Sequence, residues 1–160
     1  MNMVYFDNCA TTPLSPATKQ AIIDNLDEFG NPSSVYELGR RARIKVEEAR
    51  EKIADIINAD PGEVIFTSGA TESNNWVLCQ SWYDYKFISN IEHPSIFNLL
   101  STYDNIQVDT DGIVRDASRR PYSNLYNFLT SIMMVNNELG TINPIKELCE
   151  TVHKNCGKFH

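Results

Sequence analysis

The stretch between Val64 and Asn75 constrains the fold of this 160-residue chain more than any other. Its apolar beginning predicts a strand at 64–66, and the turn at Ser68-Gly69 leads into a helix-compatible segment that begins at Ala70. A helix that starts there presents unpaired N–H groups and the positive end of its dipole, and both favour a phosphate. Hydroxyl donors would come from Ser68, Thr71 and Ser73.

This motif alone does not identify a phosphate-bearing ligand. The chain has neither the Gly-x4-Gly-Lys-Ser/Thr pattern of a P-loop nor the Gly-x-Gly-x2-Gly pattern of a dinucleotide site. An ordinary strand-to-helix turn of an α/β domain explains the same residues equally well.

Composition narrows the class of protein. With 42% hydrophobic residues, the chain can form one core, and its net charge of −7 argues against nucleic acid as the main partner. No apolar run approaches the ~20 residues of a membrane span, and no basic leader precedes an apolar stretch. We therefore expect a cytoplasmic protein that does not bind a membrane, with reduced thiols at its scattered cysteines.

Alternating helix and strand signals predict an α/β fold with a mainly parallel sheet flanked by helices. Helices are expected at 16–29, after the N-cap Ser15, and at 37–58, where apolar residues recur every three or four positions. Further strands are expected at 86–89, 106–108 and 130–135. Further helices are expected at 94–102 and 144–156, with Gly157 as the C-cap of the last one.

Polar residues occur at three predicted strand ends, where parallel α/β sheets bind ligands. They are Ser68 to Thr71, Glu92-His93 and Asn136-Asn137-Glu138. Together they would bring a phosphate site, an imidazole and a carboxamide to one edge of the sheet. A simpler interpretation stays open, because His93 can cap the proline-led helix that follows it and the asparagines can be turn residues.

Five segments occur in an order that resembles the N-terminal signature of the cysteine desulfurases, in the class V aminotransferase group of pyridoxal-phosphate enzymes. They are Asp7-Asn8-Cys9-Ala10-Thr11-Thr12-Pro13, Gly30-Asn31-Pro32-Ser33-Ser34, 66–75, Glu92-His93-Pro94-Ser95 and Val135-Asn136-Asn137-Glu138-Leu139-Gly140. The resemblance covers almost the whole chain. It implies the N-terminal half of the large domain of a fold type I transferase, with residues 1–14 as an N-terminal arm and 15–160 as a partial large domain.

The resemblance also implies residue roles. Ala70 and Thr71 would bind the phosphate of pyridoxal 5′-phosphate, and His93, as the catalytic residue, would stack on its ring and take part in proton transfer. Asn137 would contact the phenolic oxygen of the cofactor and the substrate, and Ala10 and Thr11 would line the pocket for L-cysteine. In the family, the cofactor is an electron sink while sulfur leaves cysteine as an enzyme persulfide for iron–sulfur cluster assembly, and alanine is released.

The sequence departs from the family at its end. In the family, the segment that resembles 157–160 continues into a strand with an aspartate for the pyridine nitrogen and a glutamine for the phenolic oxygen. The Schiff-base lysine of a Ser-x-His-Lys motif, the persulfide-forming cysteine and a substrate-binding arginine follow. This sequence ends at His160 without them, and its lysines (19, 45, 52, 86, 146, 154 and 158) lie outside such a motif. We therefore expect the chain to be inactive alone.

A zinc site is a rival interpretation of four residues with helical spacing, namely Cys149, His153, Cys156 and His160. Eleven residues of helix extend over about 16 Å, which is too far for ligands of one ion. We expect no metal site, with Cys149 in core packing and His153 exposed. A partial site shared with another chain stays open.

Two hypotheses remain. In the first, the chain is the N-terminal part of a pyridoxal-phosphate cysteine desulfurase that needs a complementary C-terminal polypeptide. In the second, which we favour for the chain alone, it is a non-catalytic remnant or an interaction module. Ending after the last helix would leave a sheet edge uncovered, so we expect self-association, with a homodimer as its simplest form.

Overall fold

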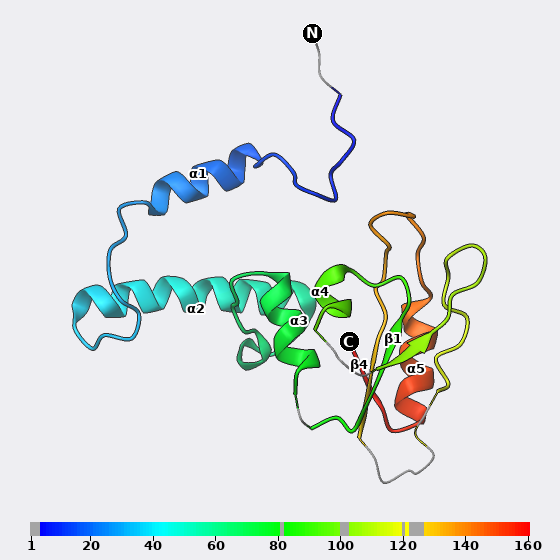
Figure 1. The fold of residues 1–160 in the computed structure, drawn as a ribbon. Helices are drawn as coiled ribbons and strands as arrows, with labels where there is room; N and C mark the ends of the chain where they lie inside the picture. Colours follow the sequence, from blue (N-terminus) through cyan, green and yellow to red (C-terminus); the bar gives the residue numbers. More distant parts are fainter. Residues whose placement is uncertain (1–3, 81, 100–102, 120, 122–126) are drawn as a thin grey trace. The chain divides into compact units, whose positions relative to one another are not determined.

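The computed structural model describes residues 4–80, 82–99, 103–119, 121 and 127–160. The chain consists of two compact units, Met1–Phe66 and Thr67–His160, whose elements are labelled in Figure 1. The boundary expected after residue 14 stays a prediction. None of the helices in the described ranges combines the length and the apolar character that a membrane crossing requires.

The first unit contains two α-helices and a short 3-10 helix. α1 (Pro16–Asn25) begins at the predicted cap, where the amide of Thr18 donates to Ser15 Oγ at 3.1 Å, but it ends before the expected residue 29. α2 (Glu37–Ile57) matches its prediction and ends where Asn58 adopts the left-handed conformation, with φ 54°. The 3-10 helix η1 (Pro61–Glu63) follows.

Gly39 lets the loop 31–34 lie directly on α2. A Cβ at this position would lie 2.7 Å from the carbonyl oxygen of Asn31 and 2.6 Å from that of Ser34. Only glycine fits so close a backbone approach. Arg43 of α2 supports the same contact, because its Nε donates to the carbonyl oxygen of Pro32 at 2.8 Å.

The second unit is built on a four-stranded sheet that is entirely parallel in the described residues, with the order β2-β1-β3-β4. The strands are β1 (Tyr85–Ser89), β2 (Asp104–Ile106), β3 (Phe128–Ser131) and β4 (Lys158–Phe159). The helices are α3 (Ala70–Leu78), α4 (Pro94–Phe97) and α5 (Ile145–Lys154). The prediction of an α/β fold with a mainly parallel sheet is confirmed.

Helices cover both faces of this sheet (Figure 1). Successive residues of each strand point to opposite faces, so apolar side chains form a core on each side of the sheet. The core on the side of α3 and α4 consists of Leu78, Ile88, Ile96 and Leu129. The core on the side of α5 consists of Phe87, Ile106, Val114, Ala117, Phe128, Ile132, Leu148 and Val152. The sheet is therefore the middle of three layers, and its carboxyl edge lies between two layers of helices.

Several predicted boundaries shift. β1 agrees with its prediction, whereas β2 ends at Ile106 instead of starting there. β3 begins at Phe128 and ends at Ser131 rather than at 135. α4 ends at Phe97, and the last expected residues of that helix, 100–102, lie outside the described residues.

The strand predicted at 64–66 is wrong. These residues pair with no strand in the part of the chain that the structure describes. A guanidinium contacts them instead, since Arg50 Nη1 donates to the carbonyl oxygen of Val64 and Arg50 Cζ lies 4.9 Å from the centre of the Phe66 ring. β propensity does not by itself supply a backbone partner.

Gly157 is not the left-handed residue that ends α5, although its amide takes part in the cap by donating to the carbonyl oxygen of Val152 at 3.0 Å. The helix ends at Lys154, and Cys156, with φ 62°, adopts the left-handed conformation. Glycine is required at 157 for a different reason, because a Cβ there would overlap Cε2 and Cζ of the Phe128 ring. Tertiary packing against β3, rather than helix termination, explains this glycine.

The edges of the sheet lead to a prediction about association. β4 has only two residues and lies at one edge of the sheet in the described residues, with β2 at the other. Because open edges pair with further strands, we expect the chain to self-associate as its concentration rises. Sedimentation velocity over a concentration series measures this, and one monomeric species at the highest concentration would contradict it.

Candidate functional site

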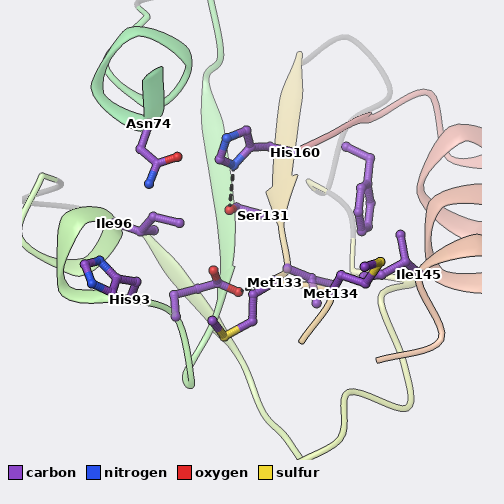
Figure 2. A pocket seen from close by; sticks show the side chains of 11 residues that line it. Asn74, His93, Ile96, Ser131, Met133, Met134, Ile145 and His160 are labelled. Atoms are coloured by element: carbon purple, nitrogen blue, oxygen red, sulfur yellow. Dashed lines mark hydrogen bonds between the residues drawn. The ribbon is translucent and has the colours of Figure 1, made fainter. Parts of the chain in front are cut away.

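A cavity of about 500 Å³ opens at the carboxyl ends of β1 and β3 (Figure 2). Its lining residues come from α3, α4 and its preceding loop, the end of β3 and its continuation, the start of α5, and the chain end: Asn74, Glu92, His93, Ile96, Ser131, Ile132, Met133, Met134, Ile145, Phe159 and His160. Parallel α/β sheets bind their ligands at this edge, so the cavity is the candidate site.

His93 caps α4 and lines the cavity at the same time. Its Nδ1 accepts from the amide of Ser95 at 3.1 Å and lies 2.8 Å from Ser95 Oγ. Because Nδ1 is an acceptor, the neutral ring carries its proton on Nε2. The cap therefore fixes the tautomer and the orientation of the imidazole, and it leaves Nε2 available to a ligand.

Glu92 is a buried carboxyl that connects two strand ends. It accepts from Ser89 Oγ at 2.5 Å and from the amide of Met133 at 2.7 Å. Burial raises the pKa of Glu92 above its ordinary 4.5, although both hydrogen bonds act in the opposite direction. Because β1 has already ended at Ser89, the carboxyl of Glu92 replaces a strand as the partner of Met133. This replacement explains why β3 ends before residue 135.

Ser131 and His160 meet at the end of β3, where Ser131 Oγ lies 2.9 Å from His160 Nδ1 (Figure 2). Burial lowers the pKa of His160 below its ordinary 6.5, so the ring is neutral at pH 7. The pair joins β3 to the residue that follows β4. Together with the backbone bonds of His160 to Thr130 and Ile132, it holds His160 beside β3.

The backbone at the start of α3 has unpaired amides where the phosphate site is predicted, and the site itself stays a prediction. The amides of Ala70, Thr71 and Glu72 have no hydrogen-bond partner in the described residues. A Cβ on Gly69 would meet nothing within 4 Å, so the space beside Gly69 is open. Unpaired amides at a helix N-terminus are the donors that anions prefer.

The side chains at the same position differ from the prediction. Ser68 Oγ donates to Glu72, and Ser73 Oγ lies 2.8 Å from Thr67 Oγ1, so neither hydroxyl is free. The hydroxyl and the amide of Ser68 lower the pKa of Glu72, which is therefore ionised at neutral pH. Its charge at the first turn of α3 opposes a phosphate, whereas the hydroxyl of Thr71 makes no hydrogen bond in the described chain.

Asn136 and Asn137 have different environments. Asn136 is buried, and its Oδ1 accepts from the amides of Glu138 at 2.9 Å and of Leu139 at 2.7 Å. Asn136 therefore acts as a turn residue, which is the simpler of the two interpretations that the sequence allowed for these asparagines. Asn137 is exposed, and its side chain has no hydrogen-bond partner in the described residues. Its carboxamide is therefore available, and its predicted role stays a prediction.

Among the predicted site residues, His93 lines the cavity. Ala70, Thr71 and Asn137 belong to the same unit but are not among the lining residues. Ala10 and Thr11 are exposed residues of the first unit, and their place in a substrate pocket stays a prediction.

Sequence-based reasoning missed Asn74 and Ser131 as site residues and treated Glu92 only as a neighbour of His93. Asn74 lies one helical turn after Ala70, so extending the α3 motif by four residues would have found it. Nothing in the local sequence marks Ser131, which becomes notable only through its bond to His160.

The residues of the zinc alternative do not form a cluster. Cys149 Sγ lies 3.7 Å from His153 Nδ1, whereas His160 bonds to Ser131. Among the residues that the structure describes, no three His, Cys, Asp or Glu side chains are grouped so that they could hold a metal ion.

Comparison with known sequences gives consistent matches. The profile of aminotransferase class-V proteins matches residues 4–160. Cysteine desulfurase IscS of Methanosarcina thermophila is 36% identical, over 98% of this chain and 42% of the relative. Cysteine desulfurase IscS 1 of Archaeoglobus fulgidus is 38% identical, over 94% of this chain and 43% of the relative.

Solved structures agree with the sequence matches. A NifS-like protein from Rickettsia africae superposes with a TM-score of 0.89 at 34% identity, over 99% of this chain and 47% of that chain. A structure of SspA in complex with cysteine gives a TM-score of 0.81 at 30% identity, over 98% and 49% of the two chains. The chain thus spans less than half the length of these relatives.

Proposed function

The chain belongs to the aminotransferase class-V family, which depends on pyridoxal phosphate, and we propose that it forms the cofactor-holding N-terminal part of a cysteine desulfurase. One observation carries this proposal. Three consecutive amides at the start of α3 (70–72) are unpaired in the described residues, and the space beside Gly69 is open. The positive end of the helix dipole adds to their attraction for a phosphate.

The residues present fit the group in further respects. Pyridoxal phosphate, when bound, supplies an electron sink. Its phosphate would be held by Ala70 and Thr71, its ring would stack on His93, and its phenolic oxygen would accept from Asn137. The fixed orientation of the imidazole and the unpaired carboxamide support these roles. Glu72 opposes them, since it adds negative charge beside the phosphate.

His93 would hold its proton at one defined atom. Because the amide of Ser95 occupies Nδ1, the ring can give or take a proton only at Nε2. Asn136 holds the turn that presents Asn137, so the carboxamide of Asn137 would be positioned by a buried neighbour. For Ala10 and Thr11, which belong to the first unit, a role in substrate binding stays a proposal.

We infer that the substrate of the whole protein is L-cysteine. Relatives named cysteine desulfurase and the SspA complex with cysteine support this choice. The whole protein would deliver sulfur for iron–sulfur cluster assembly in the cytoplasm. The Schiff-base lysine, the pyridine-binding aspartate and the persulfide cysteine would belong to the part of the whole protein that lies outside these 160 residues.

The non-catalytic alternative, a remnant or an interaction module, is the second candidate function. Under either alternative, the chain incubated alone with pyridoxal phosphate and L-cysteine should release no sulfide. Sulfide release would contradict both.

Cofactor-phosphate binding is tested with pyridoxine 5′-phosphate, which lacks the aldehyde and so cannot react with surface lysines. We expect saturable heat in titration calorimetry with this compound and none with pyridoxine, which lacks the phosphate. Ala70→Pro removes one unpaired amide at a helix position that tolerates proline. The dissociation constant of this variant for pyridoxine 5′-phosphate should therefore rise about 10- to 100-fold.

Ala70→Ser is the matched control, because it changes the side chain and keeps the amide. Its affinity should stay close to that of the unmodified chain. Equal binding of both pyridoxine compounds, or no difference between the proline and serine variants, would contradict the proposed phosphate site.

A further inference from the structure

The side chain of Asn74 leaves α3 and bonds to the next helix. Asparagine is a poor helix former, and two asparagines follow each other in the nine residues of α3. Asn75 uses its carboxamide within the helix, where Nδ2 donates to the carbonyl oxygen of Thr71 at 2.7 Å. Asn74 Nδ2 instead donates to Ser95 Oγ of α4 at 2.9 Å. A tertiary contact therefore explains the asparagine at position 74.

The hydroxyl of Ser95 joins this contact to the imidazole of the site. Ser95 Oγ lies 2.8 Å from His93 Nδ1, and the amide of Ser95 donates to the same nitrogen at 3.1 Å. A hydroxyl has one proton to donate and two lone pairs with which to accept. Because Nδ1 is an acceptor and Oγ already accepts from Asn74, the hydroxyl proton is directed to Nδ1. The hydrogen bonds therefore run in one direction, from Asn74 through Ser95 to His93.

The two helices that carry this contact pack against each other. Leu78 of α3 and Ile96 of α4 are buried in the same core. Asn74 and Ser95 are half-buried, so water competes less for their hydrogen bond than it would at an open surface. Asn74 and His93 line the same side of the cavity (Figure 2). The contact is thus placed where it can set the orientation of the imidazole.

We propose that Asn74 is a positioning residue for His93 and that it acts through the hydroxyl of Ser95. It keeps the proton of the neutral ring on Nε2 and holds the ring at the wall of the cavity. The importance of this contact for cofactor binding rests on the proposed function. The amides that would hold the phosphate begin α3, and His93 would stack on the pyridine ring, so Asn74 would connect the two parts of the cofactor site.

Asn74→Asp tests the direction of these hydrogen bonds with little change of shape. A carboxylate only accepts, so the hydroxyl of Ser95 would donate to residue 74 and accept from His93 Nδ1. The ratio of the Nδ1–H to the Nε2–H tautomer should therefore rise about tenfold, the effect of one hydrogen bond. NMR gives this ratio from the 15N frequencies of the two ring nitrogens, at about pH 9, where histidine is neutral.

Two further variants separate the contact from a general effect of charge. Asn75→Asp is the matched control, because it adds the same charge at the neighbouring position, where the side chain bonds within α3. It should leave the ratio unchanged. Ser95→Ala removes the hydroxyl and keeps the amide that donates to His93. In that background, Asn74→Asp should no longer change the ratio. Ser95→Ala alone should raise the ratio less than Asn74→Asp does, because it offers Nδ1–H no acceptor.

Three results would overturn the proposal. The first is an unchanged ratio in Asn74→Asp that circular dichroism shows to be folded. The second is an equal change with and without the hydroxyl of Ser95, because the charge would then act directly on the ring. The third is a similar change in Asn75→Asp. All of these measurements use the chain without pyridoxine 5′-phosphate, so failure here and failure of the proposed function are distinguishable.

Discussion

Replacing Gly157 with alanine should lower the free energy of unfolding of the second unit by about 1–3 kcal/mol, the usual cost of overpacking a core. The added methyl group would overlap the ring of Phe128 and lie 2.8 Å from Val152 Cγ1. Phe128 is 2% exposed and contacts Phe87 edge to face, at 5.7 Å between ring centroids, so its ring cannot move aside without disturbing the core. Urea unfolding followed by circular dichroism measures the change.

Two further variants isolate the collision. Gly62→Ala is the matched control, because a Cβ there meets nothing within 4 Å, and its effect should stay within about 0.5 kcal/mol. Phe128→Leu removes the atoms that the new methyl group would overlap. In the double variant, Gly157→Ala should therefore cost less than it does alone. Strict additivity of the two changes would show that the ring is not the obstacle.

Replacing Glu92 with alanine should lower the free energy of unfolding by about 1–3 kcal/mol for each group left without its acceptor. These groups are the hydroxyl of Ser89, which is fully buried, and the amide of Met133. Glu92→Gln keeps an acceptor oxygen and should retain most of the stability at pH 5. Urea unfolding compares the variants, and equal losses for alanine and glutamine would contradict the role of the two bonds.

The charge of Glu92 has a separate effect with a definite sign. Burial raises its pKa in the folded state, so the folded protein binds the proton more tightly than the unfolded chain. Its contribution to stability is therefore present below pH 4.5 and is lost as the pH rises through the raised value. Glutamine does not titrate, so the stability of Glu92→Gln relative to the unmodified chain should increase as the pH rises above 4.5. A constant or falling difference would contradict this.

Local signals predicted the elements that depend on residues close together in the chain. The cap at Ser15, the apolar spacing of 37–58 and the strand signal at 86–89 each depend on residues only a few positions apart, and each produced the expected element. The order of helices and strands also indicated the parallel sheet, because parallel strands need connections of this length. The motif around His93 was informative for the same reason, since the imidazole and the cap that orients it are two residues apart.

The sequence by itself thus determined the class of fold, the candidate phosphate turn and the imidazole of the site. Only the tertiary structure decided where β3 stops, why residue 157 must be glycine, and which side chains enclose the cavity. Those features depend on contacts such as Glu92 with Met133, Gly157 with Phe128 and His160 with Ser131. The partners in these contacts lie about thirty or more residues apart, and no local propensity encodes which distant group will satisfy a strand end or fill a space beside a ring.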